Sequence, residues 1–186
     1  MKKFSEKRTL SLVVLIAVAL IVIPLLGGLG LKITERRAAK EFSSIAATTD
    51  SHGNDLFSET DRLIYASNKL LEEGKRLNPD GGVEFENWAS ELENAIESCR
   101  DQKDAIGRYT SYESLFLTAK RFYNRVKSAD SSELEACMSN MDEISKGIER
   151  AYRYEYNDYR AKYDSLVSRW PGSLLAKLFG IGGGEK

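Results

Sequence analysis

A continuous apolar segment near the amino terminus constrains this chain more than any other feature. Residues 10–31 contain no charged side chain. As a helix the segment would extend about 33 Å, enough to cross a hydrocarbon core about 30 Å thick. A cleaved signal peptide is the alternative, with Ala17 and Ala19 as the small residues of its cleavage site. Because the apolar run continues for 12 residues beyond Ala19, we expect a retained membrane anchor.

Basic residues flank this segment equally on its two sides. The four on each side are Lys2, Lys3, Lys7 and Arg8, then Lys32, Arg36, Arg37 and Lys40. The positive-inside count is therefore tied. Keeping a short tail with four positive charges inside costs less than translocating it. This favours an internal amino terminus, a single pass through the cell membrane and an extracytoplasmic carboxy-terminal domain.

The charges of the remaining chain are balanced and slightly acidic. Of 27 Lys and Arg and 28 Asp and Glu, residues 32–186 hold 23 basic and 27 acidic groups. No basic block there is longer than two residues, so the electrostatic signature of a nucleic-acid-binding protein is missing. One His and two Cys do not support a metal site of the usual kinds. We therefore expect no nucleic-acid partner and no metal.

Helix breakers are rare in the part that follows the apolar segment. The prolines are Pro24, Pro79 and Pro171, and residues 83–170 contain only Gly107 and Gly147 as glycines. Such a composition predicts long helices, and no alternating apolar pattern predicts a strand. The expected fold is all-α: a single N-terminal transmembrane helix followed by an antiparallel bundle of about four long helices.

This fold implies four regions along the chain. Residues 1–9 are a basic tail, 10–31 the transmembrane helix, 32–169 the helical bundle and 170–186 an apolar, Gly-rich tail. Within the bundle, the first helix should continue to about Thr48 before a turn over 49–54. The next helix carries an apolar stripe at 3–4 spacing and should stop at the breakers of 78–82.

The stretch from 83 to 126 permits two readings. Its apolar stripe slips by one position near Gly107, where Thr110 and Glu113 have the spacing of a capping box. The stretch is either one kinked helix or two helices, and the phase slip favours the kink. After a turn over 128–131, Ser132 and Glu135 predict the cap of a last helix that runs to about Arg169.

No catalytic or cofactor-binding constellation is visible. A continuous third helix would place Cys99 and Cys137 about 33 Å apart along the bundle, whereas a disulfide needs Cα atoms within about 7 Å. Two free, buried thiols are therefore expected. His52 has no ligand cluster around it, and we interpret it as a loop residue. We expect no enzyme, no catalytic residues and no cofactor.

Tyrosines are concentrated in the last predicted helix. Tyr152, Tyr156, Tyr159 and Tyr163 share one helix face. The face either packs inside the bundle, with hydroxyls at its boundary, or binds a partner.

Three dipeptides recur at intervals of seven residues: Tyr156-Asn157, Tyr163-Asp164 and Trp170-Pro171. Such a repeat keeps the aromatic residues on one face, as in a coiled coil. With the following small apolar tail at 172–180, this pattern resembles the LemA family of bacterial membrane proteins. Their last helix typically bears two Tyr-Asn pairs and Phe-Pro. Asp and Trp are departures here, and the family's Arg-Arg and Pro-Asn-Leu stretch is absent, so the chain resembles a divergent member.

The resemblance implies a single-pass membrane protein with a helical domain and no established enzymatic activity. It implies Tyr156, Asn157, Tyr163, Asp164, Trp170 and Pro171 as family-motif residues and a candidate interface. We expect a non-enzymatic scaffold or interaction protein whose partners are the membrane and another protein, with homo-oligomerisation left open. An extracytoplasmic ligand-binding or sensor bundle is the alternative.

Overall fold

The computed structural model describes residues 30–48, 54–127 and 131–168. Residues 41–158 form one compact unit. A second unit combines the two flanking parts of the chain, of which 30–40 and 159–168 are described. None of the described helices combines the length and the apolar character needed to span a membrane. The predicted transmembrane segment 10–31 lies, apart from its last two residues, outside the described part.

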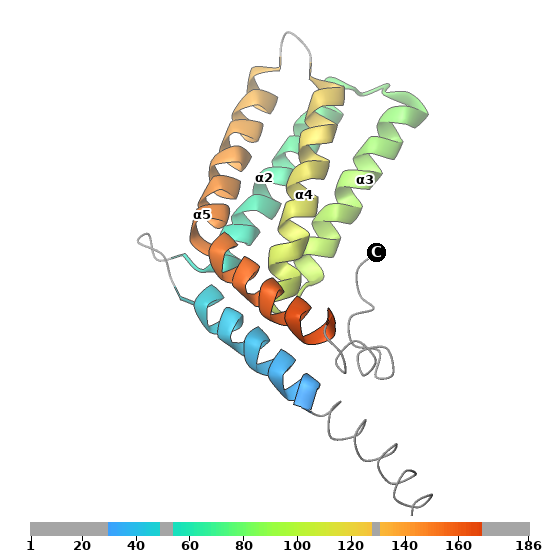
Figure 1. Ribbon diagram of the computed structural model, residues 1–186. Coiled ribbons are helices and arrows are strands. Elements are labelled where there is room, and N and C mark those ends of the chain that lie inside the picture. The colour runs from blue at the N-terminus through green and yellow to red at the C-terminus, as the bar shows by residue number, and fades with distance from the viewer. Residues whose placement is uncertain (1–29, 49–53, 128–130, 169–186) are drawn as a thin grey trace, which may run out of the picture. The chain divides into compact units, whose positions relative to one another are not determined.

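The described residues are helical and include no strand, which confirms the all-α class. After a helical stretch over 30–46, the elements are α2 (Leu56–Leu77), α3 (Gly82–Asp101), α4 (Ala105–Val126) and α5 (Ser132–Ser168). From α2 to α5 the chain reverses direction between successive helices, so neighbours in sequence run antiparallel (Figure 1). The predicted helical bundle is therefore confirmed for the unit 41–158.

Side chains at both ends of α2 explain its limits. Asp55 accepts a hydrogen bond from the Ser58 amide at 2.8 Å, and the Ser58 hydroxyl accepts from the Asp55 amide at 2.9 Å. This reciprocal arrangement satisfies two donors that a helix start leaves unpaired. At the other end, the backbone N–H of Asn78 donates to the Gly74 carbonyl at 3.1 Å, and the side-chain amide of Asn78 donates to the same carbonyl at 3.0 Å. The helix thus ends where the breakers of 78–82 predicted its end.

The favoured kink near Gly107 is wrong, because the chain breaks into two helices at residues 102–104. Asp104 caps α4 by accepting a hydrogen bond from the Gly107 amide at 2.8 Å. Thr110 and Glu113 therefore lie inside α4 and do not begin a helix. The apolar stripe slips in phase because two helices meet here, each with its own buried face.

The predicted cap of the last helix is displaced by one residue. α5 begins at Ser132, and the Glu135 amide donates to the Ser131 carbonyl at 3.0 Å. Ser132 therefore lies in the first turn and does not cap it. α5 is described to Ser168, so the predicted end at Arg169 lies just outside the described residues.

The core of residues 41–158 follows the predicted apolar stripes. α2, α3 and α4 pack against one another, and α5 adds a buried stripe of its own. Side chains less than 2% exposed come from all four helices: Leu56, Leu63, Leu70, Leu92, Leu115, Phe122, Leu134, Met141 and Ile148. The Ser67 hydroxyl lies 4.0 Å from the Met141 sulfur, which places α5 against α2.

The prediction of free thiols is confirmed, although the reason for it is not. Cys99 is buried, Cys137 is half-buried, and neither forms a disulfide. The distance argument assumed one continuous helix through Gly107, which the structure does not have. Burial raises the pKa of the Cys137 thiol, and the carboxylates of Glu73 and Glu133 raise it further. This thiol is therefore protonated at neutral pH and is a weak nucleophile.

Two helix-interior glycines should respond to alanine with opposite signs. A Cβ on Gly74 would lie 2.5 Å from the ring of Phe122, which is 1% exposed and packs on Phe85 at 6.0 Å. Because that ring has no room to withdraw, Gly74→Ala should destabilise the protein by about 1–2 kcal/mol. A Cβ on Gly147 would meet nothing within 4 Å, and Gly147→Ala should stabilise it by about 0.5–1 kcal/mol. Paired denaturant titrations check both free-energy changes. If both substitutions stabilised the protein, the close α2–α4 approach would be contradicted.

Candidate functional site

The structure describes four of the six family-motif residues, two in each unit. Tyr156 is half-buried and Asn157 exposed in the unit 41–158, whereas Tyr163 and Asp164 belong to the second unit, half-buried and exposed respectively. Trp170 and Pro171 lie outside the described residues. In that second unit, Tyr163 stacks on Tyr159 with ring centroids 6.2 Å apart.

Tyr156 belongs to a group of four rings that we call the aromatic junction: Phe42, Tyr109, Tyr112 and Tyr156. The Tyr156 ring stacks on Tyr109 at 4.4 Å and meets the edge of Phe42 at 5.7 Å. Tyr109 contacts Phe42 at 5.9 Å and Tyr112 at 5.0 Å, both edge to face. The junction links the stretch around residue 42 to α4 and α5, so its rings contribute packing between three segments.

The Tyr156 hydroxyl makes a polar contact beside these rings. It lies 3.2 Å from the Thr110 hydroxyl of α4. Because its ring is half-buried, Tyr156→Ala should destabilise the unit by about 2 kcal/mol, less than for a fully buried ring. Tyr154 on the same helix is 80% exposed and provides the matched control. Tyr154→Ala should change the free energy of unfolding by less than about 0.5 kcal/mol, and equal losses would mean that the stack is not formed.

A buried arginine, which the sequence analysis did not single out, links three helices. Arg108 of α4 is 7% exposed and donates to the Cys99 carbonyl of α3 at 2.9 Å. On α2, its guanidinium lies 3.4 Å from the Asp61 carboxylate and 5.1 Å from the centre of the Phe57 ring. We call this arrangement the Arg108 clamp. It fixes the α3–α4 connection against α2.

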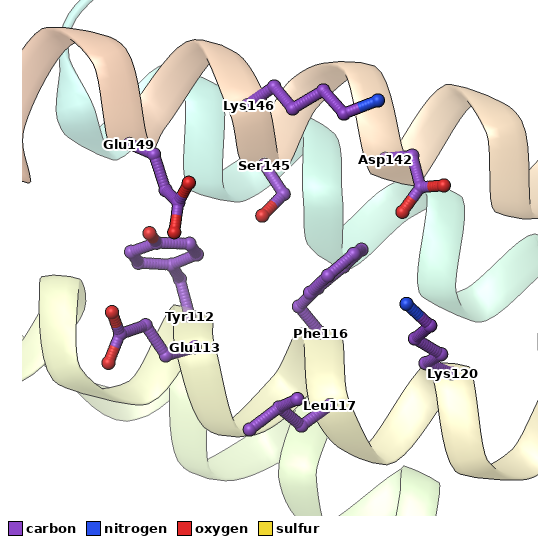
Figure 2. Close-up of a pocket in the computed structure, with 9 residues that line it drawn as sticks. All are labelled: Tyr112, Glu113, Phe116, Leu117, Lys120, Asp142, Ser145, Lys146 and Glu149. Atoms are coloured by element: carbon purple, nitrogen blue, oxygen red, sulfur yellow. The ribbon is translucent and has the colours of Figure 1, made fainter.

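A groove of about 450 Å³ lies between α4 and α5 (Figure 2). Nine side chains line this α4–α5 groove: Tyr112, Glu113, Phe116, Leu117, Lys120, Asp142, Ser145, Lys146 and Glu149. Its volume falls in the range of small-molecule sites. Figure 2 shows α2 behind the two helices, and Tyr112, Phe116 and Ser145 projecting into the space between them.

The floor of the groove carries the hydroxyls of Ser145 and Tyr112, and only that of Tyr112 is a fully buried atom without a partner among the described residues. Ser145 is 7% exposed, and Tyr112 is 1% exposed. Among the described residues, Ser145 makes no side-chain hydrogen bond, and the Tyr112 hydroxyl has no partner of suitable geometry. Burial raises the pKa of Tyr112 far above its ordinary value, and the nearby Tyr109 phenol raises it further. The Tyr112 phenol is therefore neutral at physiological pH.

The rim of the groove is charged and asymmetric. Figure 2 shows Glu113 and Glu149 on either side of the Tyr112 ring, and Lys120 with Asp142 toward the other end. Glu149 makes an exposed ion pair with Arg153 at 3.7 Å. Within the described part of the chain, Glu113 makes no ion pair. The end of the groove at Glu113 and Glu149 is therefore acidic, and Arg153 offsets part of its charge.

The environment of Glu113 should produce a measurable pH effect. The Glu113 side chain is exposed but partly desolvated. This partial desolvation raises its pKa above the ordinary value of 4.5, and the Glu149 carboxylate adds to the rise, while Arg153 opposes it. Because the folded state favours the protonated acid, this contribution to stability is present below pH 4.5 and is lost as the pH rises through the raised pKa. Glu113→Gln should therefore gain stability relative to the parent between acid and neutral pH. Thermal melting at several pH values checks this, and parallel curves would contradict it.

The composition of the groove is that of a binding site. The described residues contain no group of three or more His, Cys, Asp or Glu side chains placed to hold a metal ion. The groove combines aromatic and apolar walls with a few polar groups, which is typical of ligand sites.

Comparisons with known proteins do not add to this geometry. Neither the protein-family models, nor the curated proteins, nor the solved structures include a match to this chain.

Proposed function

We propose that this chain is a non-enzymatic, single-pass membrane-anchored interaction protein of the bacterial LemA type. The observation that carries the proposal is the uncharged segment 10–31 followed by a helical bundle. A segment of that length and composition is long enough to span a bilayer. The seven-residue spacing of the Tyr156, Tyr163 and Trp170 dipeptides supports the family assignment.

The polar members of the motif support a role in recognition. In each described dipeptide the tyrosine is half-buried, whereas Asn157 and Asp164 are exposed. Packing within the protein therefore explains the tyrosines but does not explain the polar residues that follow them. On this proposal, Asn157 and Asp164 each contact a protein partner.

Affinity capture from detergent-solubilised membranes tests this role. The bait is the full chain, compared with a double variant that combines Asn157→Ala and Asp164→Ala. The combination of Asn140→Ala and Glu143→Ala is the matched control. These two residues also carry one amide and one carboxylate, and both are exposed on the same helix. A partner captured by the parent and the control but lost from the motif variant supports the proposal. No specific partner, or one retained by all three baits, would count against it.

The orientation of the anchor is also part of the proposal. We place the amino terminus inside and the carboxy-terminal domain outside, because translocating the four basic residues before the anchor is unfavourable. A reporter fused after Lys186 that is active on only one side of the membrane measures this directly. Activity on the external side is expected, and activity on the cytoplasmic side would reverse the orientation.

The α4–α5 groove favours a second candidate function, a ligand-binding or sensor bundle. Its volume of about 450 Å³ and the unsatisfied Tyr112 hydroxyl on its floor are features of a binding site. Such a role is compatible with anchoring, because a bound small molecule could alter what the bundle presents to a partner.

A further inference from the structure

Charge is divided unevenly between the two units of the chain. Residues 41–158 hold 14 basic and 24 acidic side chains, whereas 1–40 and 159–186 together hold 13 basic and 4 acidic. The unit 41–158 therefore has a net charge of −10, and the unit that contains the proposed anchor has one of +9. Because the two values nearly cancel, the net charge of −1 conceals this division. Positive charge concentrated beside a membrane segment is typical of contact with anionic lipid.

Four of these basic residues lie together on the described helix that follows the anchor. We call Lys32, Arg36, Arg37 and Lys40 the basic stripe. At 3.6 residues per turn, they fall within about 140° of the helix circumference. All four are exposed, whereas Ala38 on the opposite side is 7% exposed. Glu35, the one acidic residue of 30–40, is half-buried and lies outside this arc.

The basic stripe has no counterion in the part of the protein that the structure describes. None of its four side chains makes an ion pair or a hydrogen bond there. In the unit 41–158, by contrast, Arg76 pairs with a carboxylate at 2.7 Å and Arg121 with another at 2.9 Å. Ion pairs within the protein therefore do not explain the basic stripe, and its charge is directed to an external anion.

The basic stripe lies within reach of a lipid headgroup layer. Lys32 is the first residue after the uncharged segment 10–31 and Lys40 the ninth, so the stripe ends about 13 Å along the helix from Leu31. A headgroup layer adds about 6 Å on each side of the hydrocarbon core. An exposed charge acts over about 8 Å more at physiological salt. An anchor that ends at Leu31 therefore keeps all four cations within the field of the lipid surface.

From these observations we propose that the basic stripe binds the phosphate headgroups of anionic phospholipids at the membrane surface next to the anchor. Its four cations select anionic over zwitterionic lipid, because only the anionic headgroup brings a net charge that neutralises them. An acidic protein fits this position less well, because the stripe begins at the residue next to the anchor, where headgroups surround the chain. The inference rests on the proposed anchoring and names the class of lipid that the protein binds.

Site-specific photocrosslinking tests this contact. Ile33 is 52% exposed and lies among the cations of the stripe, so it is replaced by the photoreactive amino acid p-benzoylphenylalanine. The full chain is reconstituted in vesicles of phosphatidylcholine and phosphatidylglycerol in equal amounts and with identical acyl chains. After irradiation, mass spectrometry measures the adducts of each lipid. Phosphatidylglycerol adducts should exceed phosphatidylcholine adducts by at least about fivefold, the effect of one basic residue at an anionic surface.

Two quadruple variants separate the stripe from the overall charge, since each lowers the net charge by four. The stripe variant combines Lys32→Gln, Arg36→Gln, Arg37→Gln and Lys40→Gln. The control variant changes two Lys and two Arg that are exposed in the unit 41–158: Arg100→Gln, Lys103→Gln, Lys146→Gln and Arg150→Gln. The stripe variant should give nearly equal adducts of the two lipids, and the control variant should keep the excess of the parent. In about 1 M salt the excess of the parent should also fall, because exposed charges are then screened within about 3 Å.

Three outcomes would overturn the proposal: no lipid adducts in the parent, equal adducts of the two lipids in the parent, or the same adduct ratio in both variants. Flotation of the vesicles on a density gradient distinguishes these failures from failure of the anchor. A parent that floats with the vesicles but shows no lipid preference would remove the role of the basic stripe only. A parent that does not float would remove the anchoring and this inference together.

Discussion

Tyr109→Ala should lower the free energy of unfolding by about 3–5 kcal/mol, the largest effect expected of any single substitution in this protein. Tyr109 is 1% exposed and is the only ring of the aromatic junction that contacts all three others, with centroid distances of 4.4 to 5.9 Å. Removing its ring leaves a cavity between three helical segments, and the surrounding rings cannot close it without giving up their own contacts.

Denaturant titration of the full chain in a mild detergent, followed by circular dichroism, measures this loss. Tyr109→Phe keeps the ring and should cost less than about 1.5 kcal/mol, so it remains measurable if the alanine variant does not fold. Tyr154→Ala removes the same atoms from an 80% exposed position and should change stability very little. A loss below about 1 kcal/mol for Tyr109→Ala would show that the junction is not packed as described.

Arg108→Met should lower the free energy of unfolding by about 3 kcal/mol. The substitution keeps much of the side-chain volume but removes three interactions: the bond to the Cys99 carbonyl at 2.9 Å, the ion pair with Asp61 at 3.4 Å and the contact with the Phe57 ring. Most of the cost comes from the bond to Cys99, because a charged donor bonds strongly and the site is buried. Asp61 is 64% exposed and remains solvated, so its share is small.

The same titration separates these contributions. Asp61→Asn should cost less than about 1 kcal/mol, because that side of the clamp faces water. Arg100→Met is the control, since Arg100 is exposed near the end of α3 and makes no hydrogen bond or ion pair among the described residues. Equal effects of Arg108→Met and Arg100→Met would mean that the clamp does not hold α3 and α4 against α2.

Local signals made most of the helix limits predictable. The breakers over 78–82 act on the residues next to them, so the end of α2 can be read from the order of the residues. The break before α4 was missed because residues 101–104 contain neither Gly nor Pro. The local signal for the break is Asp104, whose side chain caps a new helix. That helix starts at Ala105, before the position of the favoured kink at Gly107.

The Arg108 clamp and the α4–α5 groove could not be predicted in the same way. Arg108 occupies a buried position in a helix, where the apolar pattern expects a hydrophobic residue, and its partners lie on two other helices. The groove depends on which residues of α4 lie opposite which residues of α5. Glu113 and Glu149 are 36 residues apart, and only the antiparallel packing brings them to the same end of the groove.

The central claim, membrane anchoring by residues 10–31, is tested most directly by alkaline carbonate extraction of cells that produce the full chain. A double variant carrying Val18→Asp and Ile21→Asp places two charges in the middle of the segment, each unfavourable by about 3 kcal/mol in a bilayer. The parent should remain in the membrane pellet and the variant should move to the supernatant with its helical content retained. A parent that is extracted, or a variant that stays in the pellet like the parent, would contradict the claim.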